Sequence, residues 1–76
     1  MPTLFLIEDE ATLAKNIARY LERHCWDVEV ASTAEDALPR IGAVGPDIIM
    51  LDFNLPGMDG LAALSILRER DPQVRI

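Results

Sequence analysis

Two short apolar runs along the chain each end in carboxylates. Residues 4–7 are continuously apolar and lead directly into Glu8, Asp9 and Glu10. Residues 47–52 repeat the pattern, because four apolar residues there lead into Asp52. A strand that is buried on both faces of a parallel sheet has such a continuous apolar run. We therefore predict two buried strands, at residues 4–7 and 47–52.

Helical periodicity follows the first run. Between residues 11 and 24, Leu13, Ile17 and Leu21 recur at every fourth position, and charged side chains occupy the positions between them. This spacing predicts an amphipathic helix with one apolar face. Residues 27–31 then alternate charged and apolar side chains, which indicates a half-buried strand near the edge of a sheet.

A helix start signal follows this second strand. Ser32 and Glu35 match a capping box, in which the hydroxyl and the carboxylate each accept a hydrogen bond from a backbone N–H near the helix start. Apolar residues at helical spacing come after it. Pro39 lacks an N–H and its ring crowds the carbonyl four residues earlier, so we predict a short or kinked helix that breaks at residues 42–46.

The last third of the chain predicts a loop, a helix and the start of a strand. Residues 54–60 contain one Pro and two Gly, which indicates a loop, and leucines at helical spacing from residue 61 predict a helix that ends near residue 71. Residues 74–76 begin a further strand. Strands and helices thus alternate, which predicts an α/β fold with a parallel sheet, right-handed crossovers and helices on both faces.

Composition and charge exclude several classes of protein. The 76 residues are 50% hydrophobic and 26% charged, which is typical of a globular chain of one domain or less. The net charge of −6 argues against direct binding of nucleic acid, which needs clustered Lys and Arg. The first residues match neither a signal peptide nor a membrane span, and a lone Cys25 fits a reducing cytosol. We expect a cytoplasmic protein without a membrane partner.

The acids that end the two buried strands suggest a metal site. Ligands of open parallel sheets bind beyond the carboxyl ends of the strands, and Glu8, Asp9 and Asp52 would converge there if the two strands are neighbours. Clustered carboxylates oppose their joint ionisation unless a cation neutralises them. Mg²⁺ suits oxygen ligands, and Mg²⁺ beside a carboxylate nucleophile is a combination that carries out phosphoryl transfer.

Three other polar residues are predicted to be structural. Glu10 is a solvated acid near a helix start, where the helix dipole favours it. Asp59 is expected to cap the third helix rather than to bind metal. His24 stands alone near the end of the first helix, where an imidazolium is favourable.

The segments around the acids resemble a known family. The sequences FLIEDE at residues 5–10 and DIIMLDFNLPGMDG at residues 47–60 closely resemble the response-regulator receiver domains of two-component signalling. Each motif is weak alone, but the two together at this spacing are highly specific, and the resemblance covers the whole chain. It implies a flavodoxin-like, doubly wound sheet with strand order 2-1-3-4-5, in which the first and third strands are side by side.

The resemblance also implies roles for individual residues. Asp52 is the phosphoacceptor and receives a phosphoryl group from a sensor histidine kinase. Asp9 is a direct Mg²⁺ ligand, Glu8 acts largely through water, and Asn54 offers its backbone carbonyl. Phosphorylation then switches a C-terminal output domain, which in this family often regulates transcription, so the chain is a signalling module rather than an enzyme.

The chain also departs from the family pattern. A complete receiver domain continues through a fourth and a fifth strand, whose ends carry a Ser or Thr and a Lys that contact the phosphoryl group. Residues 1–76 contain neither position, and Lys15 on the first helix matches no such motif. We therefore expect a partial receiver domain that ends after the third helix and the start of the fourth strand. The apolar edge of its third strand would favour self-association or exchange of elements between two copies.

Two other functions fit the same sequence. A receiver-like module could serve for docking alone, without phosphorylation, in which case it would not need to bind Mg²⁺. A Mg²⁺-dependent phosphatase or phosphotransferase of related architecture also forms an aspartyl phosphate. Such enzymes usually place a second acid two residues after the nucleophile, where this chain has Asn54, and this difference disfavours the enzyme.

Overall fold

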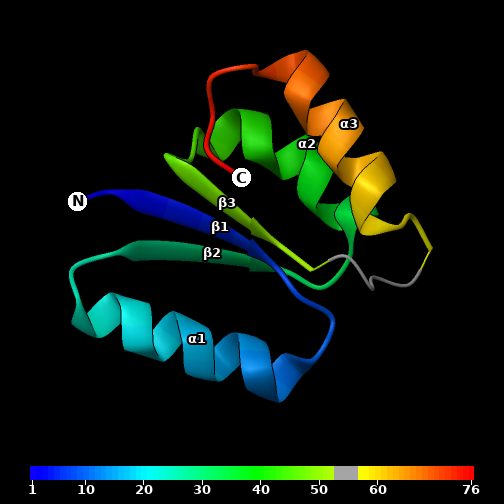
Figure 1. The fold of residues 1–76 in the computed structure, drawn as a ribbon. Helices are drawn as coiled ribbons and strands as arrows, with labels where there is room; N and C mark the ends of the chain where they lie inside the picture. The colour runs from blue at the N-terminus through cyan, green and yellow to red at the C-terminus, as the bar shows by residue number, and fades with distance from the viewer. Residues whose placement is uncertain (53–56) are drawn as a thin grey trace.

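Strands and helices alternate along the chain, as the apolar pattern predicts (Figure 1). The structure is a computed structural model, which describes residues 1–52 and 57–76. Within these ranges the elements are β1 (Thr3–Ile7), α1 (Ala11–Arg23), β2 (Asp27–Ala31), α2 (Ala34–Val44), β3 (Ile48–Leu51) and α3 (Gly60–Arg70). No helix in the described ranges is long and apolar enough to span a bilayer.

The three strands form one parallel sheet with β1 in the centre. The order is β2-β1-β3, so the two strands that end in acids are direct neighbours. Leu6 pairs with Met50 and Ile7 pairs with Leu51, so β1 and β3 end side by side at the same edge of the sheet. This order confirms the flavodoxin-like fold expected from the resemblance.

Helices cover both faces of the sheet, as predicted (Figure 1). Successive residues of β1 point to opposite faces, because side chains alternate along a strand. Leu4 and Leu6 pack against Ala14 of α1, whereas Phe5 and Ile7 pack against α2 and α3 on the other face. β1 is therefore buried from both sides, which explains why its sequence is continuously apolar.

The helix α1 departs from the predicted apolar face at one position. Ile17 and Leu21 pack against the core on its side of the sheet, but Leu13 is 42% exposed. Ala14 is buried in its place. The small side chain lets α1 lie close to β1 and β2, so the contact line runs through residue 14 rather than 13.

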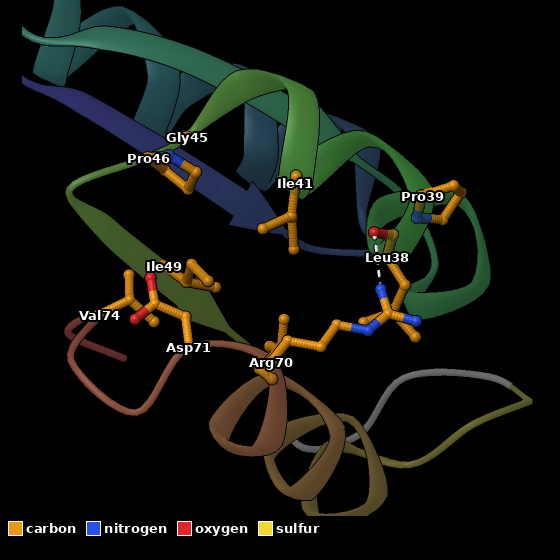
Figure 2. A pocket seen from close by; sticks show the side chains of 11 residues that line it. Leu38, Pro39, Ile41, Gly45, Pro46, Ile49, Arg70, Asp71 and Val74 are labelled. Atoms are coloured by element: carbon orange, nitrogen blue, oxygen red, sulfur yellow. Dashed lines mark hydrogen bonds between the residues drawn. The ribbon is translucent and has the colours of Figure 1, made fainter.

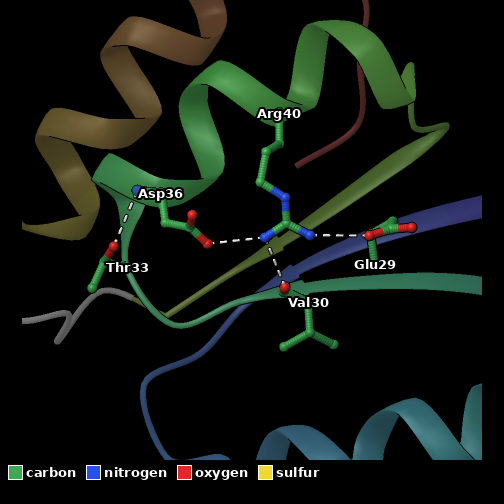
Figure 3. A network of polar contacts seen from close by, with 5 residues as sticks. All are labelled: Glu29, Val30, Thr33, Asp36 and Arg40. Carbon is green, nitrogen blue, oxygen red and sulfur yellow. Dashed lines mark hydrogen bonds and ion pairs between the residues drawn. The ribbon is translucent and has the colours of Figure 1, made fainter.

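A network around Arg40 joins α2 to the edge strand β2 (Figure 3). The Arg40 guanidinium donates to the Val30 carbonyl at 3.1 Å, forms ion pairs with Asp36 at 2.9 Å and Glu29 at 3.0 Å, and lies 5.2 Å from the centre of the Phe5 ring. Because Glu29 and Val30 belong to β2, the network holds the outer strand against the helix.

The predicted capping box is wrong by one residue. Thr33, not Ser32, is the N-cap of α2, and its hydroxyl accepts a hydrogen bond from the Asp36 N–H at 3.1 Å. Among the described residues, the Glu35 carboxylate does not accept the hydrogen bond from the N-cap backbone N–H that a capping box would have. This carboxylate lies against Gly57, where an added Cβ would clash with Glu35 Oε2. Gly57 has φ +78°, so glycine fits both the conformation and the space.

The predicted short helix is wrong in its length, although α2 ends within the predicted break at residues 42–46. The helix has 11 residues and continues through Pro39 to Val44, and Gly45 ends it in a left-handed conformation with φ +60°. The missing N–H of Pro39 removes one bond to the first turn. Burial of Ala37 and Leu38 before this position, and packing of Ile41 and Val44 against the core after it, keep the helix intact.

A fourth strand begins where predicted. Arg75 pairs in parallel with Ile48, and the Ile49 N–H donates to the Arg75 carbonyl at 2.8 Å. Val74 is buried in the core shared by α2 and α3. The chain after α3 thus joins the sheet beside β3.

Candidate metal and phosphoacceptor site

The acids lie at the carboxyl ends of the two neighbouring strands, as the sequence predicts. The Asp52 N–H donates to the Ile7 carbonyl at 3.2 Å, and the Glu8 N–H donates to the Ala31 carbonyl at 3.0 Å. These bonds extend the sheet pairing one residue beyond each strand. The backbone of both acids is therefore held by the sheet rather than by a free loop.

The side chains of Glu8, Asp9 and Asp52 come together at this edge. One carboxylate oxygen from each of the three lies within 4.8 Å of the others. Glu8 and Asp52 are half-buried and Asp9 is exposed. The structure thus gathers the three carboxylates that the sequence singled out, with one side open to solvent.

The crowding raises the pKa of Glu8. The Glu10 N–H donates to Glu8 Oε1 at 3.1 Å and lowers this pKa. Partial desolvation, the negative charge of Asp52 and the contact with Asp9 act in the opposite direction and leave the pKa above its ordinary value. The cluster consequently stores electrostatic repulsion, which a bound cation would relieve.

The geometry fits a small divalent cation. Mg²⁺ binds oxygens at about 2.0–2.1 Å, so ligand oxygens on one ion are about 3–4 Å apart. Carboxylate oxygens already within 4.8 Å of one another need only a small movement to reach this spacing. The donors are all hard oxygen atoms, which suit Mg²⁺ better than soft metals. Asn54, the fourth predicted ligand, lies outside the described residues.

Among the described residues, the cluster of carboxylates does not include the three that were predicted to be structural. The Asp59 carboxylate accepts from the Ala62 N–H at 2.8 Å and caps α3, as expected. Glu10 precedes α1 and makes no side-chain cap bond. At the other end of α1, His24 Nδ1 lies 2.8 Å from the Tyr20 carbonyl, and its ring stacks on that of Tyr20 with a centroid separation of 4.5 Å.

One feature near the acids was missed from the sequence. A groove of about 510 Å³ runs between α1 and β2, and its walls include Glu8, Asp9, Lys15 and Arg19. Lys15 matches no family motif, so the motifs alone do not indicate a role for it. The sequence does contain a signal for this groove. Lys15 and Arg19 are one helical turn apart, on a predicted helix that starts directly after the acids, so both can lie on the same face of that helix.

Comparison with known proteins supports the same family. The model of the response regulator receiver domain matches residues 4–76. The transcriptional regulatory protein TrcR of Mycobacterium tuberculosis is 40% identical over 68 residues, which are 90% of this chain and 26% of TrcR. The regulatory protein LuxO of Vibrio cholerae is 37% identical over 71 residues, 93% of this chain and 16% of LuxO.

Solved structures agree with the sequence relatives. The BeF3-activated N-terminal receiver domain of RstA from Klebsiella pneumoniae superposes with a TM-score of 0.86 at 34% identity, covering 90% of this chain and 58% of that one. The chain therefore spans only part of the length of each relative. With nearly all of its residues matched by the family model, this chain belongs to the response regulator receiver domain family.

Proposed function

We propose that this chain accepts a phosphoryl group on Asp52 from a sensor histidine kinase, beside a Mg²⁺ ion held by Glu8, Asp9, Asp52 and the backbone carbonyl of Asn54. The observation that supports it is the convergence of three carboxylates, within 4.8 Å of one another, at the ends of two adjacent parallel strands. Membership of the receiver family supports the same role.

Each residue has a defined part in this proposal. A carboxylate oxygen of Asp52 attacks phosphorus, the bond from phosphorus to the donor imidazole breaks, and an aspartyl phosphate forms. The backbone hydrogen bond from Asp52 to Ile7 fixes the position from which the Asp52 side chain extends. Bound Mg²⁺ supplies the positive charge that lets a phosphoryl group approach the acids. Glu8 and Asp9 hold this charge in place.

The proposal extends to the protein of which this domain is a part. Phosphorylation adds negative charge at the end of β3, and this change would bias a surface that a C-terminal output domain senses. TrcR and the related RstA of Escherichia coli are named as transcriptional regulatory proteins, which supports transcription as the output. Such a switch works in the cytoplasm as a signalling module, without catalysing a reaction on a substrate of its own.

A second copy of the chain is the proposed partner of β3. A groove of about 370 Å³ lies along this strand and is lined by Ile48, Met50 and Ile76 among other apolar residues. Met50 is 41% exposed although it lies in the sheet. Arg75 pairs with the start of β3, and the rest of this strand edge carries apolar side chains, which favours pairing or element exchange between copies.

The direct test of phosphorylation is the intact mass after incubation with acetyl phosphate and Mg²⁺. We expect a gain of one phosphoryl group that requires Mg²⁺ and is absent from Asp52→Asn. Asp59→Asn is the matched control, because it changes a neighbouring acid but keeps the oxygen that caps α3. If neither this chain nor a version extended through the fourth and fifth strands forms an adduct, or if Asp52→Asn is still modified, the phosphoacceptor role is wrong and a docking module becomes the better explanation.

A further inference from the structure

The groove of about 510 Å³ between α1 and β2 adjoins the acids of the candidate site. Glu8 and Asp9 form part of its wall, and one carboxylate oxygen of each lies within 4.8 Å of one from Asp52. Small apolar side chains of α1 and β2 line it elsewhere: Ala14, Ala18, Val28 and Val30. One part of the groove is therefore next to the position at which we expect a phosphoryl group to be transferred.

Two cations of α1 also line this groove. Lys15 and Arg19, the groove cations, are both exposed and lie one helical turn apart. The helix begins at Ala11, directly after the acids. Because an α-helix rises about 1.5 Å for each residue, Lys15 is about 6 Å and Arg19 about 12 Å along the axis from the helix start. Lys15 is thus the groove cation that lies nearer to the site.

The groove cations differ from several other cations of the chain in having no internal partner. Arg40 forms two ion pairs (Figure 3), and Arg70 donates to the Leu38 carbonyl at 3.1 Å (Figure 2). Arg68 donates to two carbonyl groups of the segment after α3. Within the part of the chain that the structure describes, neither groove cation forms an ion pair or a side-chain hydrogen bond. Their charges can therefore act on a molecule that approaches from solvent.

The charge around the site shows where these cations act. An anionic phosphodonor must approach the three acids of the site, and a bound divalent cation would balance two of their three charges. At the groove, Glu22 adds one negative charge and the groove cations add two positive charges. The local charge is then close to zero, whereas it would be about −2 without the groove cations. The net charge of −6 on the whole chain adds to the repulsion of an anion.

We propose that Lys15 and Arg19 guide small anionic phosphodonors, such as acyl phosphates, to Asp52. In the transfer itself a carboxylate oxygen of Asp52 attacks phosphorus, the bond from phosphorus to the acyl oxygen breaks, and a carboxylate leaves. The groove cations touch none of these atoms, and they act by raising the local concentration of the anionic donor. This inference rests on the proposed function and adds to it the charge class of the donor and the residues that attract it.

The first test is the rate at which acetyl phosphate modifies Asp52, followed by intact mass in saturating Mg²⁺. At an ionic strength of about 0.01–0.03 M, where the Debye length is about 20–30 Å, we expect Lys15→Gln to lower this rate about twofold and Arg19→Gln to lower it less. At about 1 M the Debye length is about 3 Å, and the variants should match the wild type. The version extended through the fourth and fifth strands is used if only that version forms an adduct.

Arg23→Gln is the matched control. It removes the same charge from the same helix, but Arg23 is about 18 Å along the axis from the helix start and is not among the described residues that line the groove. The rate should therefore change by less than about 1.3-fold at low ionic strength.

The affinity for Mg²⁺ provides a readout of opposite sign. A positive charge beside the acids repels a divalent cation, so Lys15→Gln should bind Mg²⁺ about twofold more tightly at low ionic strength while it is phosphorylated more slowly. An NMR titration that follows the Glu8 and Asp52 amide resonances measures this affinity. A variant that was merely misfolded would lose both Mg²⁺ binding and phosphorylation.

The outcomes separate this inference from the proposed function. An unchanged rate in Lys15→Gln at low ionic strength, a loss that persists at about 1 M, or an equal loss in Arg23→Gln would overturn guidance by the groove cations, whereas the adduct on Asp52 would still support the phosphoacceptor role. Absence of an adduct from every version would overturn both.

Discussion

Cys25 occupies a position that glycine usually fills. The Trp26 N–H donates to the Leu21 carbonyl at 3.1 Å and the Cys25 N–H to that of Glu22 at 3.3 Å, which is the Schellman pattern at the end of a helix. Cys25 has φ +66° and an exposed side chain. A side chain in this left-handed conformation costs about 1 kcal/mol, which glycine avoids.

We therefore expect Cys25→Gly to raise the free energy of unfolding by about 0.5–1 kcal/mol, part of the gain being offset by the greater freedom of glycine in the unfolded chain. Urea denaturation measures this change. Cys25→Ala is the control, because it removes the thiol but keeps the strained conformation. A gain in Cys25→Ala as large as in Cys25→Gly would show that the thiol, not the backbone, is responsible.

Glu8 makes stability depend on pH and on metal. Its pKa is raised in the folded chain, so the folded state holds the proton more tightly than the unfolded state does. Stability is therefore fully retained below the ordinary pKa of a glutamate and falls as the pH rises through the raised value. At neutral pH without metal, Glu8→Gln removes a repelling charge and should raise the Tm by about 2 °C.

The measurement is a set of thermal melts in chelator and in Mg²⁺. The advantage of Glu8→Gln should disappear in acid, where the wild-type carboxyl is protonated, and should reverse in Mg²⁺, where the wild type gains a bound ion. Glu22→Gln, which neutralises an exposed acid on α1, should show neither effect. An advantage of Glu8→Gln that stays constant at every pH would rule out the repulsion.

At the scale of elements, the Arg40 network determines how firmly β2 is held. Its ion pairs are partly exposed, so each contributes well under 1 kcal/mol, whereas the bond to the Val30 carbonyl and the contact with the Phe5 ring add to them. We expect Arg40→Ala to lower the free energy of unfolding by about 1–1.5 kcal/mol, measured in urea. Arg40→Lys should lose about half as much, because one ammonium cannot reach all the partners.

The control for this prediction is another arginine. Arg19 is exposed on α1, and Arg19→Ala should change stability by less than about 0.5 kcal/mol. High salt should shrink the effect of Arg40→Ala only in part, because the bond to Val30 is screened less than the ion pairs are. An effect of Arg40→Ala no larger than that of Arg19→Ala would mean that the network does not hold β2.

The elements show what sequence can and cannot predict. Strand positions and the convergence of the acids follow from the apolar runs, because parallel strands end at one edge of the sheet. The predicted burial on both faces is correct for β1 but wrong for β3, in which Ile49 is buried and Met50 is 41% exposed. The start of α2 does not follow, because Ser32 and Thr33 precede Glu35 and Asp36 and either register matches a capping box. The pairing of Ala31 with Ile7 determines which residue caps the helix, and these two residues are 24 positions apart in the sequence.

Local propensity also misjudged the length of α2. Pro39 and Gly42 both disfavour a helix, yet it continues to Val44 because Leu38 and Ile41 pack against the sheet and α3. In the site, the positions of Glu8, Asp9 and Asp52 were predictable. The raised pKa of Glu8 and the groove beside Lys15 were not, because both depend on distances between segments far apart in sequence.

At the scale of the whole molecule, the two faces of the sheet are covered unequally. Among residues 1–52 and 57–76, the hydrophobic core on the face toward α2 and α3 holds ten buried residues, whereas the core on the face toward α1 holds three. Met50 lies on the α1 face and in register with Leu6, yet it is 41% exposed because α1 lies over β1 and β2. A chain of 76 residues buries only about 60% of its unfolded surface, so additional burial here would stabilise it substantially.

This imbalance predicts self-association that depends on concentration. Covering β3 with a second copy would bury Met50 and Ile48, at about 25 cal/mol for each Å² of apolar surface removed from water. We expect light scattering to show dimers at high concentration and Met50→Lys to restore the monomer, because a lysine on an open strand opposes pairing. Leu61→Lys on α3 is the control, since Leu61 is 68% exposed but lies outside the groove along β3. A monomer at every concentration, or equal effects of the two lysines, would show that β3 is not the contact surface.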